Sequence, residues 1–392
     1  MPTVASISSA SGNAVFRWLR TGGMGLDAML AAIGEATVSI ALETYIFTPG
    51  PLGTRFLNAL VAARQRGVRV QVLVDALGSI GLISGFWAPL IRAGGEFRWF
   101  SAFSTSQRYG RRNHRKLLII DSRIAFIGGF NIGEVYYGDG VSQGWRDLGM
   151  ELQGPVVEIL AASFVTLFAK ANSRPALFPQ LLPMPESTIA GPNWTLLLSE
   201  PGRGHRALKR SLIRDLARAR RVRMICAYFL PPWRLRRAMM RAARRGAEVQ
   251  LILAGLTDVP VSKLASSSLY GKLMRAGIQI FEYQPQILHA KLVLIDDVVY
   301  VGSANLDTRS LNINYELTVR LNDLEAAKEA REIFESDLAH CRRLHPAVWR
   351  TRGMWTRLLE RVAYLLLARV DPYIARLRWQ RRTHEVLEQL DS

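Results

Sequence analysis

Two segments of the chain repeat one spacing of potentially reactive side chains. Each reads His-x-Lys-x4-Asp and is followed by Gly-x-x-Asn. The repeated residues are His114, Lys116, Asp121 and Asn131 in the first segment, and His289, Lys291, Asp296 and Asn305 in the second. With six histidines and seven lysines in 392 residues, chance gives about 0.1 His-x-Lys pairs. Two complete copies therefore indicate a functional site.

The chemistry that this pattern suits is the transfer or cleavage of a phosphodiester. Residues two apart on a strand point to the same face, so each segment presents an imidazole beside an ammonium group. One neutral imidazole can attack phosphorus to give a phosphohistidine, while the other, protonated, donates a proton to the leaving oxygen. The lysines and asparagines then bind the non-bridging oxygens. Because only seven of the 51 basic residues are lysine, lysine at both places indicates that a compact ammonium is required.

A nucleophilic histidine also needs an acceptor at its other ring nitrogen, commonly a carboxylate. Asp147 and Glu316 are the candidates for this histidine-orienting role, since each follows the asparagine of its segment. Asp121 and Asp296 fall at expected turns, where capping is favoured over catalysis. The sequence contains no HExxH, clustered carboxylates, Cys/His ligand spacing or Walker-type glycine loop. It therefore predicts neither a catalytic metal nor a cofactor.

An internal duplication includes both segments. The matching stretches are 38–47 with 222–230, 60–76 with 239–255, 92–100 with 275–283, and 112–131 with 287–307. Each series reads strand, helix, strand, helix and hairpin, which indicates an α/β fold with a mostly parallel sheet covered by helices. We expect two similar α/β/α sandwich halves, packed about a pseudo-twofold axis with one shared active-site cleft. The expected divisions are a first half at 1–175, a proline-rich linker at 176–193, a second half at 194–345 and a basic amphipathic C-terminal segment at 346–392.

The net charge of +19 predicts an anionic partner, either nucleic acid or an acidic membrane surface. Residues 354–382 place apolar side chains at helical spacing with arginines between them, as in a helix that lies in a membrane interface or one that packs on the protein's own core. Basic stretches such as 233–246 lack the aromatic interleaving of a single-strand binding groove. An anionic phospholipid membrane is therefore favoured over nucleic acid. Neither a signal peptide nor a stretch of about 20 apolar residues is evident, so peripheral binding is expected.

These motifs resemble those of the phospholipase D superfamily, which carries two HxKxxxxDxxxxxxGxxN patterns at the junction of two α/β halves. Within it, the sequence is most similar to bacterial cardiolipin synthases of the short type without N-terminal transmembrane helices. The similar stretches are 42–47, 114–133, 145–147, 227–229, 281–283 and 289–316. The resemblance implies a covalent phosphohistidine and substrate binding by Gly129, Ser303, Glu43, Tyr45 and Tyr228. The second motif departs from the pattern, with five residues instead of six between Asp296 and Gly302.

The resemblance further implies a phosphatidyltransferase, a cardiolipin synthase. It would transfer a phosphatidyl group from a phospholipid, with phosphatidylglycerol the favoured donor, to the hydroxyl of phosphatidylglycerol. A phospholipase D that forms phosphatidic acid and a metal-independent endonuclease of the same superfamily are the alternatives. The expected location is peripheral, on the cytoplasmic face of the bacterial inner membrane. The sequence leaves open which histidine attacks first, because the two motifs are chemically equivalent.

Overall fold

The computed structural model describes residues 12–82, 85–100, 112–171, 188–200 and 207–370. Residues 176–187 of the predicted linker and 371–392 of the predicted C-terminal segment lie outside the described residues. The first half contains β1 (Val15–Leu19), α1 (Gly22–Glu35), β2 (Ser39–Thr44), α2 (Pro51–Gln65), β3 (Arg69–Asp75), α3 (Ala88–Arg92), β4 (Glu96–Phe100), β5 (Leu117–Ile120), β6 (Ile124–Gly128), the 3-10 turn η1 (Glu134–Tyr136), β7 (Gly149–Gln153) and α4 (Pro155–Ala171).

The second half repeats this order and adds elements at its end. It contains β8 (Thr188–Ala190), β9 (Trp194–Ser199), α5 (Ala207–Leu216), β10 (Arg221–Cys226), α6 (Trp233–Arg244), β11 (Glu248–Leu256), α7 (Pro260–Met274), β12 (Gln279–Ile287), β13 (Lys291–Ile295), β14 (Val298–Gly302), α8 (Thr308–Asn312), β15 (Glu316–Asn322), α9 (Leu324–Leu338), β16 (Cys341–Arg343), α10 (Pro346–Arg350), α11 (Met354–Leu365) and the π-helical turn η2 (Leu366–Val370).

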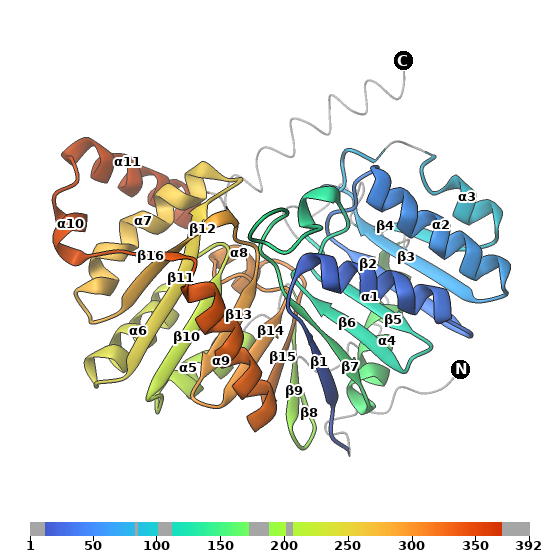
Figure 1. Cartoon of the computed structure of the whole chain (residues 1–392), viewed down its shortest axis with the longest axis horizontal. Helices are drawn as coiled ribbons and strands as arrows, with labels where there is room; N and C mark the ends of the chain where they lie inside the picture. Colours follow the sequence, from blue (N-terminus) through green and yellow to red (C-terminus); the bar gives the residue numbers. More distant parts are fainter. Residues whose placement is uncertain (1–11, 83–84, 101–111, 172–187, 201–206, 371–392) are drawn as a thin grey trace, which may run out of the picture.

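Each half is built on one mixed sheet, and the two sheets share a topology (Figure 1). The strand orders are β1-β7-β6-β5-β2-β3-β4 and β16-β12-β11-β10-β13-β14-β15-β9-β8. Strands β2, β3 and β4 are parallel, as are β10, β11 and β12, and the hairpin strands beside them are antiparallel. This is the two-halved α/β fold that the sequence predicted.

Matching glycines explain how each half returns its chain from helix to strand. Helices α2 and α6 are followed by Gly67 and Gly246, whose φ angles are +94° and +95°. This left-handed backbone ends a helix and strains any residue with a side chain. No atom lies within 4 Å of a Cβ added at either position. The two glycines are therefore required for backbone conformation, not for packing space.

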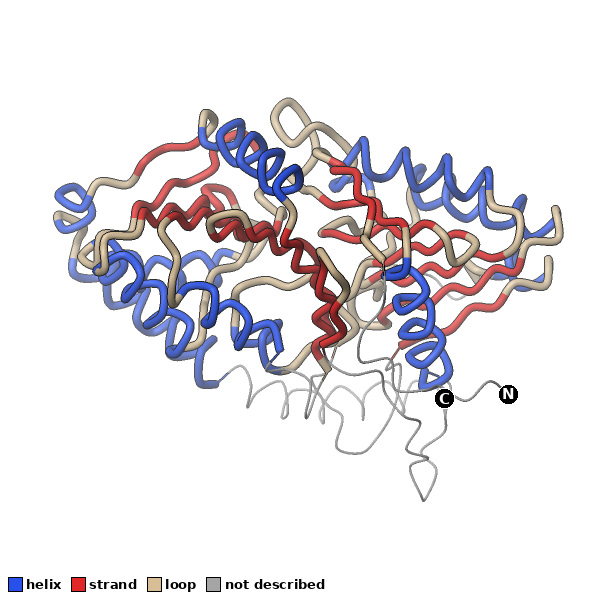
Figure 2. The backbone as a smooth tube through the Cα atoms, turned by 90° about the horizontal axis from the view of Figure 1, so that it is seen from below, coloured by secondary structure: helices blue, strands red, loops and turns tan. Residues whose placement is uncertain are grey.

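Three clusters of buried apolar side chains stabilise the fold. One packs under α1 and α2, and another under α5, α6 and α7. The third is shared, because it joins Trp18 and α4 of the first half to Trp194 and α9 of the second. Figure 2 shows the strands of both sheets between helices on the outer sides. The two halves thus meet through a common core, which fixes the strand ends that carry the motifs.

Two local features differ from the expectation. Residues 188–190 of the predicted linker form β8, which pairs with β9 at the edge of the second sheet. His114, Lys116 and His289 lie in the segments that lead into β5 and β13, just before the strands themselves.

No helix among the described residues is long and apolar enough to cross a membrane.

Candidate active site

Backbone hydrogen bonds between the halves hold the two motif histidines. The N–H of His114 donates to the carbonyl of Tyr315 over 3.0 Å, and the N–H of His289 donates to the carbonyl of Arg146 over 2.7 Å. Both contacts lie at isolated parallel bridges that run from one half to the other. Each motif is therefore fixed by the half that carries the other motif.

The side chains cross between the halves in the same way. Nδ1 of His289 lies 2.6 Å from Oδ2 of Asp147, and Nδ1 of His114 lies 3.0 and 3.1 Å from the two carboxylate oxygens of Glu316. All four residues are buried. A carboxylate at Nδ1 orients the ring and leaves Nε2 as the nitrogen that meets phosphorus or a transferred proton. The two residues predicted to orient the histidines do contact them, each in the opposite half.

Burial lowers the pKa of both histidines. For His289, burial and the neighbouring Lys291 outweigh the attraction of Asp147 and lower the pKa to about 4. For His114, burial lowers the pKa against the opposing attraction of Glu316. Burial alone would raise the pKa of Asp147, but His289 and Lys291 lower it below its usual range. Burial therefore favours the neutral imidazole at both histidines beside an ionised Asp147, and a bound phosphodiester anion would favour the protonated form of one of them.

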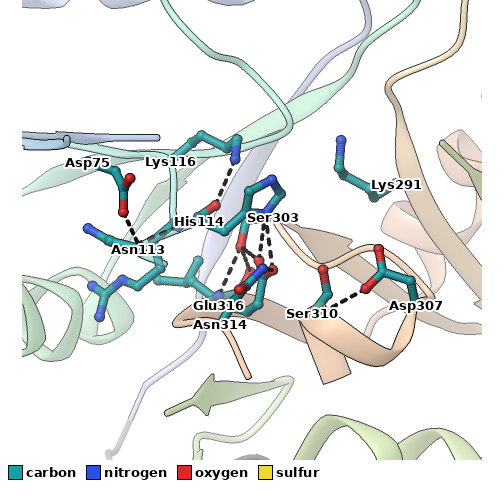
Figure 3. A network of polar contacts seen from close by, with 12 residues as sticks. Asp75, Asn113, His114, Lys116, Lys291, Ser303, Asp307, Ser310, Asn314 and Glu316 are labelled. Atoms are coloured by element: carbon teal, nitrogen blue, oxygen red, sulfur yellow. Dashed lines mark hydrogen bonds and ion pairs between the residues drawn. The ribbon is translucent and has the colours of Figure 1, made fainter. Parts of the chain in front are cut away.

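Lys116 and Lys291 are buried beside the histidines, and Figure 3 shows His114 between their side chains. Each ammonium donates to the carbonyl of its own motif histidine, Lys116 over 2.7 Å. Burial lowers the pKa of Lys116 to about 7 and that of Lys291 to about 8, although Glu316 and Asp147 oppose the shift. An ammonium has three donors and the carbonyl uses one. The others can bind a phosphoryl oxygen, which would stabilise the charged form.

The motif asparagines follow β6 and β14. Oδ1 of Asn131 accepts from the N–H of Ile46 over 3.0 Å, and its side-chain amide interacts with the hydroxyl of Tyr136. Oδ1 of Asn305 is buried with no hydrogen-bond partner among the described residues. Since buried polar atoms are normally paired, this amide is available to a polar group of a bound molecule.

Substrate binding by Gly129 and Ser303 stays a prediction, and the structure shows how both residues relate to the carboxylates that contact the histidines. A Cβ at Gly129 would lie 1.9 Å from Oδ1 of Asp147, so the glycine leaves space for that carboxylate. Ser303, at the equivalent position, is fully buried and donates to Oε2 of Glu316 over 2.5 Å. Both residues act on the carboxylates that orient the histidines. The two halves differ at this position. Gly129 lies beside the carboxylate of Asp147, and Ser303 lies beside the longer side chain of Glu316.

Substrate binding by Glu43 also stays a prediction, and its observed contacts are with residues beside His114. It is fully buried, accepts from Nδ2 of Asn113 over 2.7 Å and lies 3.2 Å from the guanidinium of Arg115. Asp75 accepts from the N–H of Asn113 over 2.9 Å. Glu43 therefore supports the segment around His114. Sequence reasoning missed Asp75, Asn113 and Arg115, although two of them flank the motif histidine.

Asp121 and Asp296 lie at the ends of β5 and β13 that are remote from the histidines. Their carboxylates accept from backbone N–H groups at the start of the neighbouring strand, β2 or β10. These groups belong to Thr37, Val38 and Ser39 for Asp121, and to Arg220 and Arg221 for Asp296. Both aspartates adopt left-handed backbone, with φ of 53° and 52°. Both aspartates therefore tie a hairpin turn to its neighbouring strand, which is the capping role favoured over catalysis from the sequence. The shorter second turn leaves this contact intact.

Aromatic rings lie beside both histidines. The ring of Tyr45 is centred 4.9 Å from that of His114, and Tyr136, which sequence reasoning did not find, is 5.2 Å from His289. The hydroxyl of Tyr228 donates to an aspartate over 2.6 Å. Substrate binding by Tyr45 and Tyr228 stays a prediction. Among the described residues, no group of three or more His, Cys, Asp or Glu is placed to hold a metal ion.

Comparison with known proteins identifies the family of this chain. The family model described as "Cardiolipin synthase, PLD-like domain" matches residues 29–138 and 212–338. The chain is 34% identical over 358 residues to cardiolipin synthase B of Escherichia coli K12, covering 89% of this chain and 86% of that protein. The chain belongs to the cardiolipin synthase family. Another member, the major cardiolipin synthase of Bacillus subtilis, is 31% identical over 348 residues, which are 86% of this chain and 72% of that protein.

Solved structures share the fold of this cardiolipin synthase family member. Phosphatidylserine synthase of Haemophilus influenzae has a TM-score of 0.71 and 14% identity, and the match covers 92% of this chain and 94% of that one. Polyphosphate kinase of Porphyromonas gingivalis has a TM-score of 0.56 and 17% identity, covering 86% of this chain and 49% of that one. At such low identity the likeness concerns the fold alone. It confirms the predicted two-halved architecture.

Proposed function

We propose that this protein transfers a phosphatidyl group from one phosphatidylglycerol molecule to a hydroxyl of a second, through a phosphatidyl-histidine, and releases glycerol. The observation that carries the proposal is the crossed pairing of His114 with Glu316 and of His289 with Asp147. This pairing supplies two oriented imidazoles at one place. Family membership supports phosphatidyl transfer, since the related proteins are named cardiolipin synthases.

Two histidines suffice to balance the reaction. Nε2 of one attacks phosphorus of the donor, and the bond from phosphorus to the headgroup oxygen breaks as the other, protonated, histidine gives that oxygen its proton. Glycerol leaves. The second histidine, now neutral, takes the proton of the acceptor hydroxyl, whose oxygen attacks phosphorus as the phosphorus–nitrogen bond breaks. Cardiolipin forms and both histidines return to their starting states.

The buried cations and amides stabilise the charge that develops on the non-bridging oxygens. Lys116 and Lys291 are fixed by backbone carbonyls, and the side-chain amide of Asn131 is held by Ile46 and Tyr136. A preorganised donor of this kind contributes on the order of 3 kcal/mol to transition-state binding. The proposed steps use neither a metal nor a cofactor.

The proposed partner is an anionic membrane that contains phosphatidylglycerol, at the cytoplasmic face of the bacterial inner membrane. The net charge of +19 supports this, because each basic residue near an anionic surface contributes about 1 kcal/mol. Nucleic acid is not part of the proposal.

Product analysis tests the proposed function. Purified protein is incubated in EDTA with phosphatidylglycerol vesicles, and separately with single-stranded DNA. Cardiolipin and glycerol in equal amounts are the expected products, and EDTA should not affect the rate. Phosphatidic acid without cardiolipin would replace the transferase by a hydrolase. Cleaved DNA with unchanged lipid would replace the substrate class while leaving the two-histidine site in place.

A further inference from the structure

Helix α11 turns its apolar side chains away from the protein. Trp355, Leu358, Leu359 and Val362 lie at helical spacing, and between 45 and 74% of each is exposed. A helix on the surface of a globular protein normally buries such residues. We call these four residues the α11 stripe.

The opposite face of α11 attaches it to the second half, where it lies along α7 (Figure 1). Its buried residues are Glu360 and Ala363, and Glu360 pairs with Arg352. The hydroxyl of Tyr364 accepts from Arg236 of α6 over 3.3 Å. The helix is therefore docked through a partly polar face. Its apolar stripe is left for something other than the protein's own core.

Other exposed apolar residues lie near the carboxyl ends of the parallel strands, beside the histidines. We call this side of the two sheets the histidine-bearing edge. Strand pairing places the starts of β5 and β13, and with them His114 and His289, beside the carboxyl ends of β2 and β10. At the same edge, Ile80 follows β3, Trp233 follows β10 and Leu256 ends β11, and all three are exposed. Apolar surface and reactive groups therefore share one edge of the molecule.

Trp233 connects this edge to α11. It is the first residue of α6, one turn before Arg236, and Arg236 binds Tyr364 near the end of α11. The last turn of α11 therefore lies close to the carboxyl edge of the second sheet. The stripe and the edge can contact one extended surface.

Basic groups accompany these apolar side chains. The guanidinium of Arg237 lies 5.0 Å from the ring centre of Trp233, and Arg357 and Arg361 are exposed on α11. An amphipathic helix that combines tryptophan, leucine and arginine suits the interface of an anionic bilayer.

We propose that the α11 stripe and Trp233 insert into the interface of a bilayer rich in anionic phospholipid and hold the histidine-bearing edge against it. The choice of a lipid surface as partner rests on the proposed function. In this arrangement a lipid headgroup reaches His114 and His289 while its acyl chains stay out of bulk water.

Vesicle binding tests the proposal without requiring turnover. The full chain is sedimented with vesicles of phosphatidylglycerol and phosphatidylcholine in equal parts, and with phosphatidylcholine alone. The test variant is Trp355→Asp with Leu359→Asp. The matched control is Val15→Asp with Val165→Asp, which adds the same charge at residues that are 63 and 58% exposed on β1 and α4. Activity on phosphatidylglycerol with short acyl chains, below its micelle concentration, shows whether each variant is folded.

We expect the test variant to bind the anionic vesicles at least tenfold more weakly than the wild type, and the control to stay within twofold. Both variants should keep their activity on the monomeric short-chain lipid. Unchanged vesicle binding by the test variant would overturn the proposal. A second result would also overturn the proposal. If light scattering shows that the wild type and the control are dimers and the test variant is a monomer, a second copy of the chain covers the stripe. If the wild type binds anionic vesicles, the test variant does not, and the wild type shows no phosphatidyl transfer, the proposed membrane-binding surface is supported and the proposed function is refuted.

Discussion

The carboxylate of Asp147 lies 2.6 Å from Nδ1 of His289, although the two residues belong to different halves of the chain. Glu316 and His114 form the reciprocal contact. Because each imidazole takes its orientation from the other half, neither half by itself contains a complete histidine–carboxylate pair. The duplication therefore produced one site with two reactive groups, not two separate sites.

Replacing Asp147 by Asn should reduce kcat for phosphatidyl transfer by about 10³- to 10⁴-fold, because the amide no longer fixes the reactive tautomer of His289. The change preserves size, so the melting temperature reports whether the fold is intact. Glu151→Gln is the control, since Glu151 lies on β7, which follows Asp147, and pairs with the surface residue Arg17. Equal activity of the two variants would contradict the role of Asp147.

Gly129→Ser copies the residue that the second motif has at this position. Its Cβ would lie 1.9 Å from Asp147, so the carboxylate must move away from His289, and kcat should fall by about 10²-fold or more. Gly34→Ala is the control, because no atom lies within 4 Å of the added Cβ. That control should keep full activity and gain up to about 1 kcal/mol in the free energy of unfolding. A fully active Gly129→Ser variant would show that a side chain at position 129 does not displace Asp147 from His289.

Lys116→Arg should lower kcat by about 10²-fold, because the broad guanidinium does not fit where a buried ammonium binds the His114 carbonyl. Lys328→Arg, at an exposed position of α9, keeps the same chemistry and should be neutral. Transfer rates on phosphatidylglycerol compare the two. Wild-type rates for Lys116→Arg would mean that only positive charge is needed.

The pH dependence of kcat/KM should be bell-shaped. A neutral His289 is lost as the pH falls through its pKa of about 4. The ammonium charges of Lys116 and Lys291 are lost as the pH rises through about 7 and 8. Because these groups interact, each limb reports the cluster and not one residue. An activity that keeps rising above pH 9 would be incompatible with protonated lysines in the transition state.

Asp121→Asn should affect stability and spare the chemistry. The amide keeps one acceptor oxygen for the backbone N–H groups that the carboxylate now binds, and asparagine tolerates the left-handed backbone. We expect the free energy of unfolding to fall by about 1–2 kcal/mol, with kcat of the folded protein unchanged within twofold. Asp297→Asn serves as the control, because Asp297 is the exposed residue next to Asp296. Urea unfolding compares the free energies of unfolding of the two variants. A large loss of kcat would return Asp121 to the catalytic group.

The repeat was sufficient to predict the two-halved fold and to single out His114, Lys116, His289 and Lys291, which the structure brings together, since periodicity and spacing are local properties of a sequence. Asp147 and Glu316 each contact the histidine of the other half. These contacts depend on how the two halves pack together, which residue spacing within one half does not specify. The contacts of Gly129, Ser303 and Glu43 with supporting residues could not be predicted for the same reason. Whether a motif residue contacts substrate or supports a neighbour depends on packing, and Asp75 contacts Asn113 from 38 residues away.

Trapping the covalent intermediate tests the two-histidine account most directly. Phosphatidylglycerol labelled at phosphorus is mixed with excess protein, quenched in alkali within one turnover and separated from free lipid. We predict label on the protein that is stable to alkali and released by acid, as expected for a phosphoramidate, and that maps to His114 or His289. The label should be lost when that histidine is replaced by Ala. Rapid cardiolipin formation with no label on either histidine at any time would contradict the account.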